Sequence, residues 1–261
     1  MLFSKSLKQQ NWQEFNCGMV KGWQCKELLK FPSLKHLFTS KSGDLNLGKH
    51  APYIFPEKSV EKNRETLCKS LEISYEFLKV LPLTHSNNIS ILEESSQQLA
   101  ECDALITNLK NIPLLITAAD CVPILLYAPE KNILGIIHAG WRGTAGRITE
   151  KTVIAIQENY LVRPSQIFAV IGPAIGQNNY EVSDEVARSL VDSCESDSIL
   201  ETSGTKPKAD LKKANQLQLD NAGVMKIFVS ELDTATQTSL FYSHRVQGKR
   251  AGRQGLIACL V

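Results

Sequence analysis

Two reactive side chains, Cys121 and His138, border apolar runs in the stretch TAADCVPILLYAPEKNILGIIHAGWRGTAGRI, and a third, His85, follows another apolar run in LPLTHS. Two imidazoles and a thiolate from three separate segments suit an open catalytic zinc site, in which water or substrate takes the fourth position. Without a metal, the same residues could form a cysteine nucleophile with a histidine base. A blue-copper centre would need a weak axial ligand, often methionine, and neither Met19 nor Met225 lies near the motif.

The loop HAGWRGTAG supplies a second chemical feature, a glycine-rich turn before an expected helix. Gly140 and Gly143 permit close approach of the backbone, and we expect Thr144 to cap the helix. Arg142 and Arg147 add two guanidinium groups. Together these residues predict an anion site at the helix N-terminus after Gly143, suited to a phosphate or a carboxylate.

The elements that must position these residues alternate between strands and helices. Strands, several of them apolar throughout and therefore buried on both faces, are expected at 112–117, 123–128, 132–139, 167–172 and 225–230. Helices are expected at 59–72, 144–160, 183–194 and 210–223. This pattern favours an α/β fold with sheet beneath helices. The turn at 129–132 makes a hairpin of its flanking strands, and we expect Cys121 and His138 near opposite ends of it.

Composition favours one soluble domain and gives no case for nucleic-acid or membrane binding. The 261 residues include 29 Lys plus Arg and 27 Asp plus Glu, and the basic residues are scattered along the chain. The amino end lacks the apolar core of a secretory signal, and no run approaches membrane-spanning length, so we expect a cytoplasmic protein. Seven cysteines without a CxxC pair argue against a disulfide framework, and those other than Cys121 are expected to be packing or surface thiols.

The longer motifs extend these observations over most of the chain. ADCVPILL followed by GIIHAGWRGTAGRI strongly resembles the YfiH family, also called the laccase-domain or polyphenol oxidase family. LFTSKSGDLNLGKH, CDALITN, IGPAIGQNNYEVSDEV and FYSHRVQGKRAGRQ fall in the family's order from about residue 36 to the carboxyl end. The resemblance implies one α/β/β/α domain over residues 1–261, with mixed sheets layered between helices and residues 1–35 as an N-terminal extension.

The same resemblance implies an enzyme, a purine nucleoside phosphorylase. Its partners would be phosphate and purine nucleosides (adenosine, inosine, guanosine or methylthioadenosine), with adenosine deaminase as a side activity. By position, the family's metal ligands fall on His85, Cys121 and His138, with zinc as the implied ion and copper as the alternative. The implied substrate-binding residues are Asn46, Arg142 and Arg245. The chain would act as a monomer or a homodimer.

We expect catalysis to involve Cys121, His138, Arg142 and Asp120. Asp120 would either support the ligands or accept a proton. His50 matches a family position near the pocket, whereas His36 is expected to be structural and Trp141 to anchor its loop by packing.

The sequence also departs from the family's pattern around the ligands. LTHS stands where the family usually has QVHG, Asp233-Thr234 replaces a Cys-Thr pair, and Val246 replaces the second arginine of SYRR. These changes keep every metal ligand and alter its surroundings. Three alternatives therefore stay open: a cysteine-type hydrolase that edits peptidoglycan precursors, a copper-dependent polyphenol oxidase, and a degenerate nucleoside-binding protein without turnover.

Overall fold

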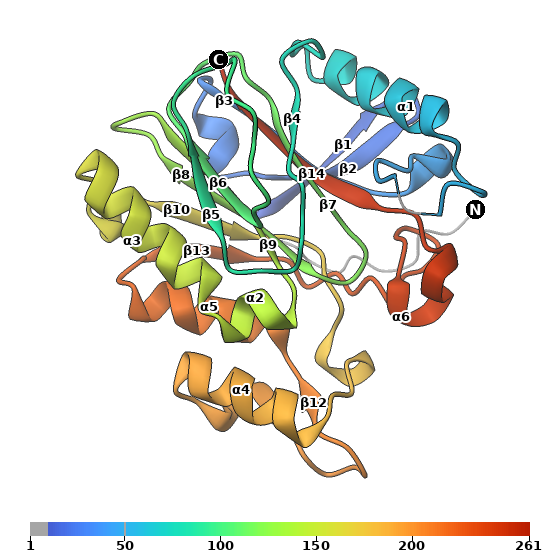
Figure 1. Cartoon of the computed structure of the whole chain (residues 1–261), viewed down its shortest axis with the longest axis vertical. Helices are drawn as coiled ribbons and strands as arrows, with labels where there is room; N and C mark the ends of the chain where they lie inside the picture. Colours follow the sequence, from blue (N-terminus) through green and yellow to red (C-terminus); the bar gives the residue numbers. More distant parts are fainter. Residues whose placement is uncertain (1–9, 50) are drawn as a thin grey trace.

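Two six-stranded mixed sheets form the centre of the molecule in a computed structural model that describes residues 10–49 and 51–261 (Figure 1). The first sheet has the order β1-β2-β3-β14-β7-β4 and consists of β1 (Trp12–Cys17), β2 (Val20–Cys25), β3 (Leu34–Thr39), β14 (Gln254–Leu260), β7 (Leu114–Ala118) and β4 (Lys79–Val80). The second sheet has the order β13-β10-β8-β9-β6-β5 and consists of β13 (Lys226–Val229), β10 (Phe168–Ile171), β8 (Val122–Ala128), β9 (Ile133–Ala139), β6 (Ala104–Thr107) and β5 (Ile89–Leu92). A separate pair joins β11 (Leu200–Glu201) to β12 (Lys208–Ala209).

Helices cover the outer faces of both sheets. They are α1 (Glu57–Ser70), α2 (Trp141–Ala145), α3 (Ile148–Tyr160), α4 (Asp184–Cys194), α5 (Leu211–Asn221) and α6 (His244–Gln247). Leu67 of α1 shares a buried cluster with Leu115 and Ile257 of the first sheet. On the other side, helices α3 and α5 pack on the second sheet, and α4 packs outside them against α2 and α5. The layers are therefore helix, sheet, sheet and helix, which confirms the expected α/β/β/α fold of a single domain.

The alternation of side chains along β8 explains why this strand is apolar throughout. Ile124 and Leu126 belong to the cluster beneath α3, whereas Leu125 and Tyr127 belong to the cluster between the two sheets. All seven residues of β8 are buried, as are all seven of β9. The five strands predicted from apolar runs are all present, within two residues of their expected ends.

The expected helix at 144–160 is wrong in one respect, because it is two helices. The backbone of Arg147 adopts a left-handed conformation (φ +59°) that separates α2 from α3. Thr144 is a buried residue inside α2 and not a cap, and its hydroxyl accepts a hydrogen bond from Asn215 of α5. Gly140 occupies the cap position instead.

The other predicted helices are present. Ser183 caps α4 by accepting a hydrogen bond from the Val186 amide, and Asp210 caps α5 by accepting one from Lys213. α1 begins and ends two residues before its predicted limits.

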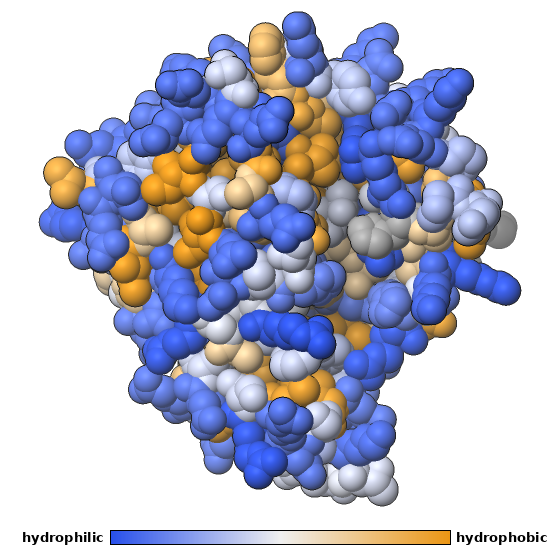
Figure 2. Space-filling view, viewed as in Figure 1, coloured by the Kyte–Doolittle hydropathy of each residue, from blue (hydrophilic) through white to orange (hydrophobic). Residues whose placement is uncertain are grey.

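The face of the molecule in Figure 2 is covered mostly by hydrophilic side chains, with smaller apolar areas between them. None of the helices described in residues 10–49 and 51–261 combines the length and the apolar character that crossing a bilayer requires.

Candidate metal and nucleoside site

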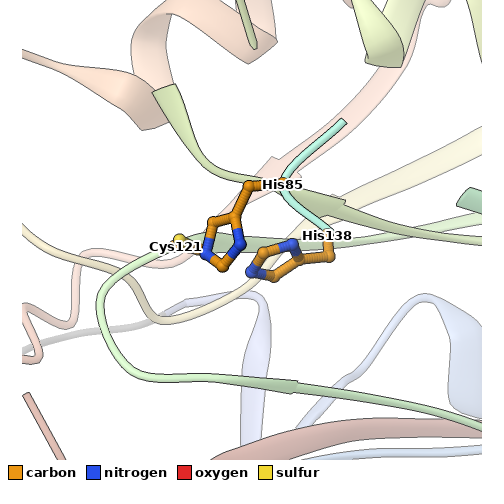
Figure 3. A group of neighbouring side chains, drawn as sticks. All are labelled: His85, Cys121 and His138. Atoms are coloured by element: carbon orange, nitrogen blue, oxygen red, sulfur yellow. The ribbon is translucent and has the colours of Figure 1, made fainter. Parts of the chain in front are cut away.

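His85, Cys121 and His138 converge in the folded chain, as their residue types suggested (Figure 3). The ligand atoms that the three side chains offer, two imidazole nitrogens and one sulfur, all lie within 4.8 Å of one another. The two imidazole rings are nearly perpendicular, at 85°, with centroids 5.0 Å apart. Among the described residues this is the one group of three or more His, Cys, Asp or Glu side chains placed to hold a metal ion.

Connections between the two sheets carry two of these three residues. Cys121 lies between β7 of the first sheet and β8 of the second, and His85 lies between β4 of the first sheet and β5 of the second. His138 comes from β9, where it pairs with Pro123 in the antiparallel ladder. The expectation that Cys121 and His138 stand near opposite ends of the hairpin is therefore wrong. The start of one antiparallel strand and the end of the next share the open end of a hairpin.

Asp103, which the sequence analysis did not select, fixes both histidines. Its Oδ1 lies 2.8 Å from Nδ1 of His138 and accepts a hydrogen bond of 3.1 Å from the backbone N–H of His85. Its Oδ2 accepts from the backbone N–H and the hydroxyl of Ser86, at 2.7 and 2.8 Å, and from the N–H of Thr84. The hydrogen bond at Nδ1 directs Nε2 of His138 toward the cluster.

A sequence signal for Asp103 existed. Asp103 directly precedes the apolar run ALIT, which forms the buried strand β6. A carboxylate next to such a run is expected at the edge of the core, where it requires partners, and Asp103 is indeed fully buried. Those partners include the backbone of His85, which has a left-handed conformation (φ +57°) that is uncommon outside glycine.

The cluster is strongly coupled electrostatically. Burial by itself raises the pKa of the Cys121 thiol, but the charges and hydrogen bonds of His138 and His85 outweigh burial and lower this pKa to about 6. Burial likewise opposes the charged form of His138, but Cys121 and Asp103 raise its pKa to about 9. The thiolate is the form of cysteine that acts as a nucleophile or binds a metal. A bound cation would replace the proton held between the thiol and the imidazole.

The donor set also fits a metal chemically. One thiolate and two imidazoles are borderline-soft ligands of the kind that zinc prefers, and three protein ligands leave a fourth position open. Gly140 lets this packing form, because a Cβ at that position would lie 3.1 Å from the Cys121 sulfur and 3.3 Å from Cδ2 of His85. Gly143 similarly passes close to the carbonyl oxygen of Ser86, 2.9 Å from where its Cβ would be. The predicted close backbone approach at both glycines is confirmed.

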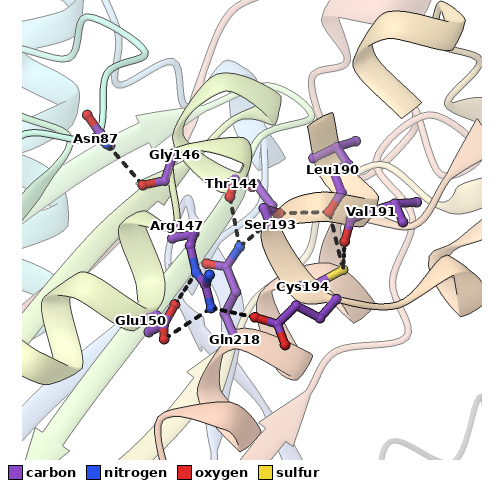
Figure 4. Close-up of polar contacts among 11 residues, drawn as sticks. Asn87, Thr144, Gly146, Arg147, Glu150, Leu190, Val191, Ser193, Cys194 and Gln218 are labelled. Carbon is purple, nitrogen blue, oxygen red and sulfur yellow. Dashed lines mark hydrogen bonds and ion pairs between the residues drawn. The ribbon is translucent and has the colours of Figure 1, made fainter. Parts of the chain in front are cut away.

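The predicted start of the helix after Gly143, on which the predicted anion site depended, is wrong. The helix begins earlier, at Trp141, and the backbone N–H of Thr144 is used inside it, donating to the carbonyl of Gly140. Arg147 points to carboxylates instead, with ion pairs of 2.5 Å to Glu150 and 3.5 Å to Glu195 (Figure 4). The guanidinium of Arg142 lies 4.4 Å from the ring centre of Trp141.

Asp120 and Arg245 come together beside the cluster. Oδ1 of Asp120 accepts a hydrogen bond of 2.7 Å from the Thr234 hydroxyl, and Oδ2 accepts one of 2.6 Å from the backbone N–H of Arg245. The Arg245 guanidinium lies over the Tyr180 ring and donates to the carbonyl of Glu181.

Tyr180 lies near both the His85–Cys121–His138 cluster and the arginines beside it. Its burial raises the pKa of its hydroxyl to about 12, and Cys121, Asp120, Arg245 and Arg142 all lie close enough to act on that pKa. These side chains therefore belong to one electrostatic environment.

Asn46 uses its side chain to join its own loop to the residue before β14. Its Oδ1 accepts a hydrogen bond of 2.6 Å from the backbone N–H of Arg253, and its Nδ2 donates to the carbonyl of Gly48. His50 lies outside the described residues. His36 is fully buried and accepts a hydrogen bond from the Cys25 amide, the structural role expected of it. The cysteines outside the cluster are buried, except the exposed Cys17.

The sequence of the chain is similar to those of several known proteins. Residues 37–261 match the family model described as multi-copper polyphenol oxidoreductase laccase. A protein of Deinococcus radiodurans named purine nucleoside phosphorylase is 33% identical over 233 residues, covering 87% of this chain and 90% of its own. The purine nucleoside phosphorylase YlmD of Geobacillus stearothermophilus is 37% identical over 235 residues, covering 84% and 85%.

Solved structures show the same architecture. The crystal structure of YlmD from Geobacillus stearothermophilus superposes with a TM-score of 0.85 at 31% identity, covering 96% of this chain and 98% of that one. The crystal structure of the YfiH protein of Bacillus licheniformis also gives 0.85, at 28% identity, with 96% and 99% covered.

Proposed function

The chain belongs to the laccase-like YfiH family, and on that premise we propose that it is a purine nucleoside phosphorylase. The names of its relatives in Deinococcus radiodurans and Geobacillus stearothermophilus support this reaction class. In phosphorolysis the bond between the ribose C1′ and the purine nitrogen breaks, a phosphate oxygen bonds to C1′, and the purine takes up a proton. The products are the free base and ribose 1-phosphate.

The observation that carries the proposal is the convergence of His85, Cys121 and His138 on one point, beside a group of arginines. These three residues would hold a zinc ion, with copper as the alternative. When bound, such an ion supplies a Lewis acid that can polarise a substrate atom. Arg142 and Arg245 place positive charge beside the cluster, where an anionic reactant must approach.

Asp103 and Asp120 have positioning roles in this mechanism. Asp103 holds the His138 ring and the His85 backbone in the orientation that brings their nitrogens to Cys121. Asp120 ties the backbone of Arg245 to the segment that carries Cys121. Both oxygens of Asp120 already accept hydrogen bonds, which favours a supporting role for it over that of proton acceptor.

The test is turnover by purified protein that has been stripped with a chelator and reloaded with zinc. We expect adenosine, inosine and guanosine to yield free base and ribose 1-phosphate in phosphate buffer and not in phosphate-free buffer. Cys121→Ala should abolish turnover, and the matched control Cys17→Ala, which removes an exposed thiol, should keep it. A nucleoside that raises the melting temperature but is never consumed would instead identify a binding protein.

Adenosine deamination is the expected side activity. An ion held by His85, Cys121 and His138 would supply the Lewis acidity that activates water for attack on the purine C6. The phosphate-free arm of the same assay measures this activity separately, as formation of inosine and ammonia from adenosine. Absence of inosine there removes the deaminase assignment and leaves phosphorolysis standing.

A second candidate, a cysteine-type hydrolase, rests on a different observation. Cys121, His138 and Asp103 line up as nucleophile, base and orienting carboxylate. Iodoacetamide separates the two functions. A catalytic thiolate reacts at once in the protein as isolated, whereas a metal-bound Cys121 reacts only after a chelator is added.

A further inference from the structure

Arg253 is a cation of the site region that the motifs did not single out. It directly precedes β14, whose first residue, Gln254, pairs with Ala118 at the end of β7. Three residues after Ala118 the chain reaches Cys121. The register of the sheet therefore places Arg253 beside the segment that carries the candidate metal ligand.

The backbone around Arg253 is held on both sides. Its N–H donates to Oδ1 of Asn46 at 2.6 Å, and its carbonyl accepts from the N–H of Leu47 at 2.9 Å. The side-chain Nη1 donates to the carbonyls of Ala251 and Gly252, at 2.7 and 2.8 Å. The guanidinium is thus fixed before any ligand binds, which reduces the entropy that binding must overcome.

The charge of Arg253 lacks a direct counter-ion. The side chain is half-buried, and within residues 10–49 and 51–261 no carboxylate lies at ion-pair distance from it. Cys121 and Asp120 are the anionic groups near enough to act on its pKa, which burial lowers. Both oxygens of Asp120 are already bonded to Thr234 and Arg245. The donors that this half-buried guanidinium leaves unused within the described residues are available to an anion, which would offset the cost of its partial burial.

The other arginines of the region differ from it. Arg142 and Arg245 are exposed and lie over aromatic rings, and Arg147 is paired with two carboxylates. A tetrahedral oxyanion matches the fork of donors on a guanidinium.

We propose that Arg253 binds the phosphate co-substrate, in place of the helix terminus that the sequence suggested. The assignment deepens the proposed phosphorolysis and rests on it for the identity of the anion. Arg253 supplies fixed positive charge on the side of the site formed by β7 and β14, within electrostatic range of Cys121.

Phosphate dependence tests the proposal. Arg253→Met should raise the KM for phosphate about 10- to 100-fold, as expected for loss of charge-assisted hydrogen bonds, and leave the KM for the nucleoside nearly unchanged. Arg253→Lys, which keeps the charge and removes the fork, should raise it less. Arg250→Met, which removes an exposed arginine three residues earlier, should behave as wild type.

A binding measurement keeps this proposal separate from the proposed function. Inorganic phosphate should raise the melting temperature of the wild type and of Arg250→Met, and not that of Arg253→Met. Arg253→Lys decides the matter if the methionine variant does not fold. Equal stabilisation of wild type and folded Arg253 variants by phosphate, or no stabilisation of the wild type, overturns the role of Arg253. Failure of the wild type to release free base overturns the phosphorylase alone.

Discussion

Replacing Asp103 with asparagine should weaken both the fold and the metal site. One carboxylate serves both histidine ligands, since it bonds the ring of His138 and the backbone N–H of His85. Asparagine keeps the shape of aspartate but turns one acceptor oxygen into a donor amide. Whichever way the amide turns, buried donors that now point at a carboxylate oxygen will point at an NH₂ group.

The size of the effect follows from the contacts. If the amide nitrogen takes the place of Oδ2, the backbone N–H groups of Ser86 and Thr84 lose their acceptor. If it takes the place of Oδ1, His138 and the N–H of His85 lose theirs. Each unsatisfied buried donor costs about 1–3 kcal/mol, and two are left in either orientation, so Asp103→Asn should lower the free energy of unfolding by about 2–6 kcal/mol. Loss of the carboxylate partner of a metal-binding histidine should weaken zinc binding about 10- to 100-fold.

The assay combines urea unfolding of the metal-free protein with zinc titration against a competing chelator. Asp233→Asn is the matched control, because Asp233 also accepts several hydrogen bonds, from the N–H groups of Gly176 and Ala235 and from Asn179, without contacting a ligand. Both variants should lose stability, and only Asp103→Asn should lose zinc affinity. If folded Asp103→Asn binds zinc as tightly as wild type does, the carboxylate does not position the ligands.

Two further predictions concern packing and pH. In Gly140→Ala the backbone angles (φ −77°, ψ 176°) suit alanine, but the new methyl group would press on the Cys121 sulfur and the His85 ring. We expect about tenfold weaker zinc binding with little change in the melting temperature of the metal-free protein, and no change in either for the exposed Gly204→Ala. A loss of fold instead of metal would contradict this. Burial lowers the pKa of His36 from 6.5 to about 4. The unfolded chain thus binds a proton on this residue at a higher pH than the folded chain does. The stabilisation by neutral His36 is complete above pH 6.5 and is lost as the pH falls toward 4, by about 3 kcal/mol. His36→Gln should show a flatter pH dependence of unfolding in that window, and an unchanged slope would show that other groups cause it.

The sheet could be predicted where burial on both faces left a continuous apolar run. β7, β8 and β9 lie between other layers and therefore have the composition of buried strands. β1 does not, because four of its six residues are exposed, and nothing in its composition distinguished it from a loop. β1 and β2 lie in the stretch 1–35 and pair with each other, and β2 also pairs with β3.

The convergence of His85, Cys121 and His138 could be predicted because these residue types are rare in the chain and follow apolar runs. The contacts that orient the ligands could not, since they depend on register. Asp103 reaches His138 because Ala104 pairs with Ile137 across the β6–β9 ladder, 33 residues apart in the chain. The break between α2 and α3 was missed because a continuous helical pattern runs through Arg147, and tertiary contacts such as that of Thr144 with Asn215 determine where the helix stops.

His85 and Cys121 lie on two of the four links by which the chain passes from one sheet to the other, and this has a thermodynamic consequence. The three donors can meet only when both sheets are formed and packed together. An ion bound to them would therefore stabilise the packing of the two sheets against unfolding. Its binding free energy would be added to global stability, about 4 kcal/mol at a free concentration a thousand times the Kd. The melting temperature of the whole protein should then rise with the concentration of free metal, although only three residues would bind the ion.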